Sequence, residues 1–258
     1  MGIIATLLSV FIAIGYSISL HYEKAIIAAL CVFLVTSGGN ILNDLYDIDT
    51  DRVNHPERPL PSGEIRTGSA RVAFLLSYFI AIGIGFPFLG IIPGITVIGA
   101  EILLFLYETR LKRTGLAGNS VIGLLVGLIF IFGGIAFNSF YKMIILFVMA
   151  ALTNIGREIT KDVQDMEGDK DRETFPKKHG VEDSMYLTVS LVVIAVAVSF
   201  LPYIFHIFSF YYLAVVVPAD AIFLYSSLLV KSGPKRSQKY SKYAMILGLL
   251  SFMVGEIA

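Results

Sequence analysis

The sequence is poor in the residues that build disulfide frameworks, thiolate metal sites and soluble surfaces. It has a single cysteine, Cys31, so neither a disulfide nor a multi-cysteine metal site can form within the chain. Only 16% of its residues are charged, against roughly 25% in a typical soluble domain. It has no tryptophan, so Tyr and Phe must supply any aromatic belt at a membrane interface. These shortages exclude an ordinary soluble domain.

Apolar residues are abundant instead, at 56% of the 258-residue chain, with a mean hydropathy of +0.77. Apolar runs of about 18–20 residues recur along the chain, and each can cross a hydrocarbon core of about 30 Å. They predict an all-α integral membrane protein with about nine transmembrane helices, forming one domain over residues 1–258. The expected helices lie near 3–20, 25–46, 71–89, 93–110, 117–137, 141–164, 185–204, 208–230 and 243–258.

Lysine and arginine are distributed very unevenly among the predicted loops. Of the 20 basic residues, 18 lie in four segments, 44–71, 110–113, 157–182 and 231–242. The other two, Lys24 and Lys142, fall in short loops on the opposite face. Because basic loops stay in the cytoplasm, we expect a multi-pass protein of the cell membrane with these four segments on the cytoplasmic side.

A first aspartate cluster lies at the end of predicted helix 25–46. Asn43, Asp47 and Asp51 are spaced four residues apart, so one helix would present them as a stripe. An EF-hand loop is an alternative, because Asp47-x-Asp49-x-Asp51 fits its first positions. It fails because Arg52 occupies the glycine position and Arg58 occupies the closing glutamate position.

A second aspartate cluster lies at the end of predicted helix 141–164. Asp162, Asp165 and Asp169 are spaced three and four residues apart and would also share a helix face. A single acid at a helix end is usually just solvated. That explanation does not account for eight of the 20 acids falling within 44–51 and 162–169. Two stripes of oxygen ligands suit Mg²⁺, which binds a few carboxylates together with substrate phosphates.

Paired magnesium sites at a membrane surface suit a prenyl diphosphate, whose tail prefers lipid and whose head is highly charged. Metal ions would neutralise the departing diphosphate while the allylic bond ionises. Nearby cations would complete the clamp. The candidates are Arg52, Arg58, Lys112, Arg157, Lys161, Lys170 and Arg172.

Three sequence motifs resemble signatures of the UbiA-type membrane prenyltransferases, and together they cover nearly the whole chain. The first is Asn43-Asp44-x-x-Asp47-x-x-x-Asp51, followed by Arg52-x-Asn54-x-Pro56-x-Arg58-Pro59-x-Pro61-Ser62-Gly63. The second is Tyr107-x-x-x-Leu111-Lys112 with Gly118-Asn119. The third is Arg157-Glu158-x-x-Lys161-Asp162-x-x-Asp165-x-Glu167-Gly168-Asp169.

The resemblance implies helices that ring a central cavity beneath a cytoplasmic cap, with two Mg²⁺ ions and a diphosphate held between the clusters. One ion would bind Asn43, Asp47 and Asp51, and the other Asp162, Asp165 and Asp169. Catalytic roles fall on Asp47, Asp51, Asp165, Asp169 and Tyr107, whose ring would face the developing cation. Substrate contacts fall on Asn43, Asp44, Arg52, Arg58, Lys112, Asn119, Arg157, Lys161 and Lys170.

Segments 130–136 and 157–169 are most similar to the branch of this family that makes archaeal ether lipids. That similarity implies transfer of a geranylgeranyl group from geranylgeranyl diphosphate to the sn-2 hydroxyl of geranylgeranylglyceryl phosphate. The partners would be a prenyl diphosphate, a lipid-phosphate acceptor and the bilayer, with no nucleic acid and no obligate protein partner. An aromatic acceptor of the quinone or tetrapyrrole type is the alternative within the family.

Two other classes of function fit the sequence less well. A secondary transporter would show inverted repeats with interrupted helices near the membrane midplane, and no such repeat is visible. A non-catalytic membrane scaffold would not require paired aspartate clusters. Glu101 and Asp220 lie within apolar runs, where ionisable groups usually face the bundle interior, and the sequence assigns them no role.

Overall fold

The computed structural model describes residues 2–166 and 173–257, and within them the only regular secondary structure is helical. The long helices are α1 (Gly2–Ile14), α2 (Tyr22–Tyr46), α4 (Thr67–Leu89), α5 (Ile91–Thr109), α6 (Leu116–Ala136), α7 (Phe140–Asp165), α8 (Phe175–Ser199), α10 (Phe210–Leu228) and α11 (Pro234–Ile257). Shorter elements are η1 (Gly15–Leu20), α3 (Ile48–Asn54), η2 (Leu111–Arg113) and α9 (Leu201–Ile204).

Eight of the described helical stretches are long and apolar enough to cross a membrane, which confirms the predicted class of protein. The ninth predicted span falls on α11, where Lys235, Arg236, Lys239 and Lys242 all precede the apolar part. Because these charges shorten its apolar stretch, α11 is outside that set of eight, and the count of nine spans stays a prediction.

Several helix boundaries differ from the sequence prediction, and α11 begins at Pro234, nine residues before the predicted 243. The predicted helix 3–20 is α-helical only to Ile14, because Gly15 takes a positive φ and the chain continues as the 3₁₀ helix η1. The predicted helix 185–204 begins ten residues earlier, at Phe175, and bends at Gly180, whose φ is 90°. It ends at Ser199 rather than 204, and a separate turn, α9, follows. Segment 47–66 contains the short helix α3, which the pattern did not predict.

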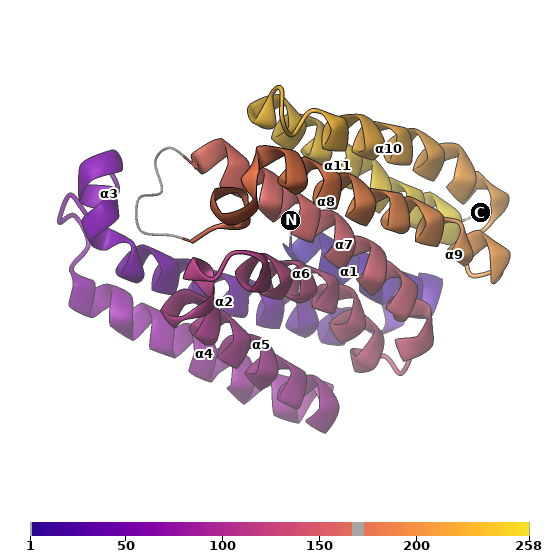
Figure 1. Ribbon diagram of the computed structural model, residues 1–258. Coiled ribbons are helices and arrows are strands. Elements are labelled where there is room, and N and C mark those ends of the chain that lie inside the picture. The colour runs from indigo at the N-terminus through magenta and orange to yellow at the C-terminus, as the bar shows by residue number, and fades with distance from the viewer. Residues whose placement is uncertain (1, 167–172, 258) are drawn as a thin grey trace.

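The helices form one bundle in which neighbours along the chain mostly pack against each other (Figure 1). On one side lie α2, α4 and α5, and on the other α7, α8, α10 and α11, with α1 and α6 joining the two groups. The last helix, α11, returns to contact α1 and α7.

Close packing of α6 on α7 depends on small residues. A Cβ atom on Gly127 would lie 2.7 Å from the backbone oxygen of Phe147, and one on Gly123 would lie 2.7 Å from that of Ala151. Between lipid-embedded helices, van der Waals contact of this kind replaces the hydrophobic drive that operates in water. The two backbones can approach this closely only because both positions are glycine, and the approach fixes α7 relative to the helices that surround the cavity described next.

Candidate active site

A cavity of about 420 Å³ lies between α2, α5, α6 and α7. Its deep part is apolar and is lined by residues such as Cys31, Val97 and Phe132. Its mouth is polar, because Asn43 and Glu108 face Glu158 and Lys161 from opposite helices. Tyr107 also lines this cavity. An apolar chamber with a charged mouth suits a ligand that has a hydrocarbon tail and a charged head.

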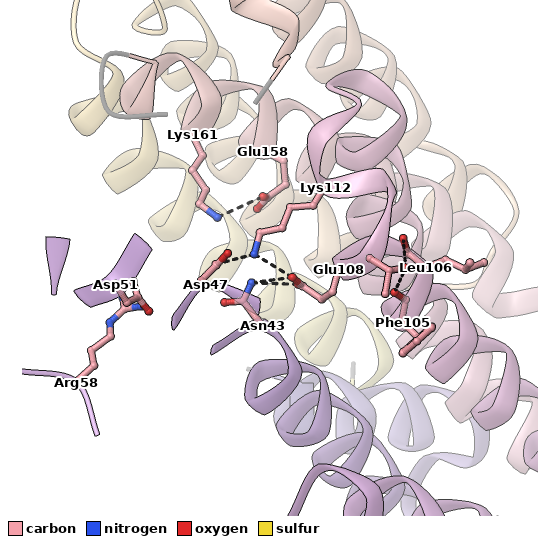
Figure 2. Close-up of polar contacts among 11 residues, drawn as sticks. Asn43, Asp47, Asp51, Arg58, Phe105, Leu106, Glu108, Lys112, Glu158 and Lys161 are labelled. Atoms are coloured by element: carbon pink, nitrogen blue, oxygen red, sulfur yellow. Dashed lines mark hydrogen bonds and ion pairs between the residues drawn. The ribbon is translucent and has the colours of Figure 1, made fainter. Parts of the chain in front are cut away.

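Glu108 is the centre of the polar contacts at this mouth (Figure 2). The amide nitrogen of Asn43 donates to both of its carboxylate oxygens, at 3.0 and 3.2 Å. The ammonium of Lys112 donates to Glu108 Oε2 at 2.9 Å and to Asp47 Oδ2 at 2.6 Å. The Glu108 and Lys112 side chains are only 5% and 9% exposed. One largely buried cluster therefore brings together four polar residues: Asn43 of α2, Asp47 just after α2, Glu108 of α5 and Lys112 of η2.

The first aspartate cluster is divided by a break in the helix. Helix α2 ends at Tyr46 and α3 begins at Ile48, so Asp47 stands between them and Asp51 belongs to the second helix. The prediction of a single helical stripe over 43–51 is therefore wrong. Asp51 instead accepts a 2.7 Å hydrogen bond from Arg58, which raises the pKa of that guanidinium above its ordinary value.

A second cavity, of about 620 Å³, lies beside this ion pair at the same end of the bundle. It is lined by Asp44, Asp51 and Arg58, and by apolar residues of the loop and of α4. Asn43 lines both cavities, so the two spaces adjoin at the end of α2. The charged segment that follows α2 therefore lies next to the mouth of the first cavity.

The described part of the second aspartate cluster lies at the end of α7. Asp162 accepts a 2.8 Å hydrogen bond from Asn119 at the start of α6, and Asp165 accepts one of 3.3 Å from Gln164. Lys161 lies 3.7 Å from Glu158 and is half exposed. Because Lys161 and Glu158 share the first cavity with Asn43 and Glu108, residues from both motifs meet at one mouth. The predicted site residues Asp169 and Lys170 lie outside the described residues.

Two predicted substrate contacts are outside the lining of the first cavity. Arg52 pairs with Asp49 at 3.0 Å on an exposed surface of α3. The Arg157 side chain lies 3.6 Å from Glu158, which lines the cavity, and the Arg157 backbone oxygen accepts a hydrogen bond from Gln238 of α11. Neither residue is among those that line the first cavity.

The residues present fit a magnesium ion through their chemistry. The Asp47 and Glu108 carboxylates both contact the Lys112 ammonium, and the Asn43 amide contacts Glu108, so several oxygen donors lie together at this end of the cavity. Among the described residues, no three His, Cys, Asp or Glu side chains are grouped closely enough to form a metal site unaided. That arrangement matches Mg²⁺, which uses one or two carboxylates and completes its shell with water and substrate phosphate.

Glu108 is one of the polar residues at the mouth that the sequence prediction missed. It belongs to neither aspartate cluster and interrupts an apolar helix, as Glu101 does one heptad earlier. Its position four residues before Lys112 was the available signal, because side chains at that spacing share a helix face. Glu101 and Asp220 are both buried, as their position in apolar runs predicts.

Comparison with known proteins identifies close relatives over nearly the full chain. The sequence pattern of the UbiA prenyltransferase family matches residues 2–251. Digeranylgeranylglyceryl phosphate synthase of Methanocaldococcus jannaschii is 39% identical over 257 residues, covering 95% of this chain and 89% of the relative. A solved structure of digeranylgeranylglyceryl phosphate synthase superimposes with a TM-score of 0.86 at 35% identity, covering 99% of this chain and 93% of the other.

A more distant solved structure shares the fold. It is a UbiA homolog from Archaeoglobus fulgidus bound to DMAPP and Mg²⁺, with a TM-score of 0.64 and 17% identity. The similarity covers 98% of this chain and 96% of that one. At this level of identity the likeness extends to the arrangement of the helices.

Proposed function

Because the chain belongs to the UbiA prenyltransferase family, we propose that it transfers a geranylgeranyl group from geranylgeranyl diphosphate to the sn-2 hydroxyl of geranylgeranylglyceryl phosphate. The observation that carries the proposal is the apolar cavity whose polar mouth combines Asn43 of the first aspartate motif with Glu158 and Lys161 of the second. The relatives named digeranylgeranylglyceryl phosphate synthase, at 36–39% identity over 90–100% of this chain, support the choice of acceptor.

In this proposal the prenyl tail occupies the apolar cavity and the diphosphate lies at its mouth. Two Mg²⁺ ions would be held by Asn43, Asp47 and Asp51 and by Asp162, Asp165 and Asp169. Bound Mg²⁺ would supply positive charge to the departing diphosphate. The DMAPP and Mg²⁺ bound by the Archaeoglobus homolog support this ligand pair. Lys112, Arg58 and Lys161 provide further positive charge from the chain itself.

The chemistry requires one bond to break and one to form. The bond between the allylic carbon and the diphosphate oxygen breaks, and its electron pair leaves with the diphosphate. The acceptor hydroxyl oxygen then bonds to the allylic carbon and loses its proton. Tyr107 lines the cavity close to its mouth, where its ring would stabilise the allylic cation. The apolar walls exclude water, which would otherwise capture that cation.

The acceptor is the part of this proposal that a product analysis tests. Purified enzyme with Mg²⁺ and geranylgeranyl diphosphate receives either geranylgeranylglyceryl phosphate or 4-hydroxybenzoate, and mass spectrometry identifies the products. We expect the ether lipid only. Prenylated benzoate as the sole product would instead assign an aromatic acceptor.

We further propose that the mouth of the cavity faces the cytoplasm, because the loops at that end hold most of the basic residues. Cys31 is replaced by Ala, and single cysteines are placed at Ser62 or Lys142. Impermeant maleimide on intact cells should label the cysteine at 142 and leave that at 62 unlabelled until the cells are permeabilised. The reverse pattern would show that the orientation is inverted.

A further inference from the structure

The motif residue Asn43 can ligate a metal ion only through its side-chain oxygen, because its amide nitrogen is a donor with no available lone pair. The orientation of its side-chain amide therefore decides whether it can serve as a ligand. In the structure that nitrogen is turned toward Glu108, at 3.0 and 3.2 Å from the two carboxylate oxygens. Figure 2 shows the Asn43 oxygen on the side away from Glu108.

A carboxylate can only accept hydrogen bonds, so the reverse orientation of the amide would place oxygen against oxygen. The Glu108 side chain is 5% exposed, so water has little access to relieve that repulsion. The same carboxylate accepts the Lys112 ammonium at 2.9 Å, which places that ammonium 2.6 Å from Asp47. Glu108 thus determines the orientation of two groups at the mouth of the cavity.

We propose that Glu108 is a positioning residue for magnesium and diphosphate binding: it orients the Asn43 oxygen toward the metal and holds Lys112 at the mouth. This inference rests on the proposed function, since it needs a magnesium diphosphate as ligand. Partners that orient a metal ligand in this way typically account for about 10–100-fold in metal affinity or activity.

The test measures binding and requires no turnover. Isothermal titration calorimetry follows geranylgeranyl thiolodiphosphate, a slowly ionising analogue, added to the full chain at a series of Mg²⁺ concentrations. For Glu108→Gln we expect the Mg²⁺ concentration that gives half-maximal binding to rise about 10-fold, because one amide then faces another and Asn43 loses its fixed orientation. Glu101→Gln is the matched control, since Glu101 is also buried on α5 but does not line the cavity, and it should bind as the wild type does.

A pair exchange separates orientation from a general structural role. Asn43→Asp alone sets two carboxylates against each other and should weaken Mg²⁺-dependent binding. The double variant Asn43→Asp/Glu108→Gln restores one donor and one acceptor with the total charge unchanged, and it should recover at least half of the lost affinity on a logarithmic scale. Thermal unfolding of each variant identifies any that has lost its fold.

The outcomes distinguish this inference from the function on which it rests. Absence of Mg²⁺-dependent binding by the wild type would overturn the proposed function. If the wild type binds the analogue and Glu108→Gln binds it with the same Mg²⁺ dependence, only the positioning role is overturned. A folded double variant that binds no better than the weaker single variant would also overturn it.

Discussion

Asp47→Ala and Asp165→Ala should each lower the rate of geranylgeranyl transfer about 100-fold or more. Each removes a carboxylate proposed to hold the metal that neutralises the departing diphosphate, and losing one principal electrostatic stabiliser typically costs this much. Asp47→Ala also frees the Lys112 ammonium to pair with Glu108 alone, so the local charge changes as well. The rate of product formation is measured by mass spectrometry at saturating geranylgeranyl diphosphate and Mg²⁺.

Asp49→Ala is the matched control for Asp47→Ala. Asp49 lies two residues further along the same acidic segment, but its side chain is 87% exposed and pairs with Arg52 on the surface. Exposed ion pairs of this kind contribute little, so this variant should keep a near wild-type rate. EDTA should abolish activity, and added Mg²⁺ should restore it. Wild-type rates for both Asp47→Ala and Asp165→Ala would contradict the proposed site.

Ala100→Phe should lower kcat/KM for geranylgeranyl diphosphate about 100-fold, because a misplaced reacting group can cost this much even when the change is remote. Ala100 lines the cavity on α5, eight residues and so about 12 Å from Glu108 at the mouth. The added ring would occupy space proposed for the prenyl tail and push the diphosphate away from its ligands. The kcat/KM for geranyl diphosphate, whose tail is half as long, should fall much less.

The control for the filled cavity is Ile102→Phe on the same helix. Ile102 is 53% exposed and is not among the residues that line the cavity, so the introduced phenyl ring would face lipid. Steady-state kinetics with both diphosphates should find it close to wild type. If folded Ala100→Phe protein uses geranylgeranyl diphosphate at the wild-type rate, the tail does not lie in this cavity.

Much of the bundle could be predicted from the sequence, because lipid imposes a simple rule on a spanning segment. An apolar run of sufficient length must be helical, since its backbone groups have no water to bond with. Boundaries were less predictable where a single backbone torsion decides them. Gly15 follows the end of α1 and Gly180 bends α8, and an apolar pattern does not reveal the positive φ that both take.

At the candidate site, too, the sequence pattern identifies the segment but not the three-dimensional contacts. The spacing of Asn43, Asp47 and Asp51 marks the segment as chemically unusual, yet it does not reveal that the helix breaks at Asp47. The contact of Glu108 with Asn43 joins positions 65 residues apart, and its partner could not be read from neighbours in the sequence. The family resemblance supplied the motif residues, whereas the structure was needed to find the buried acid that connects two of them.

The most direct test of the central claim is a structure of the protein with Mn²⁺ and geranylgeranyl thiolodiphosphate, in which anomalous scattering locates the metal. Mn²⁺ should lie against Asn43 and Asp47, with the diphosphate at the cavity mouth and the tail extending past Ala100 toward Phe132. A diphosphate bound away from this mouth, or Mn²⁺ at neither aspartate cluster, would contradict the proposed site.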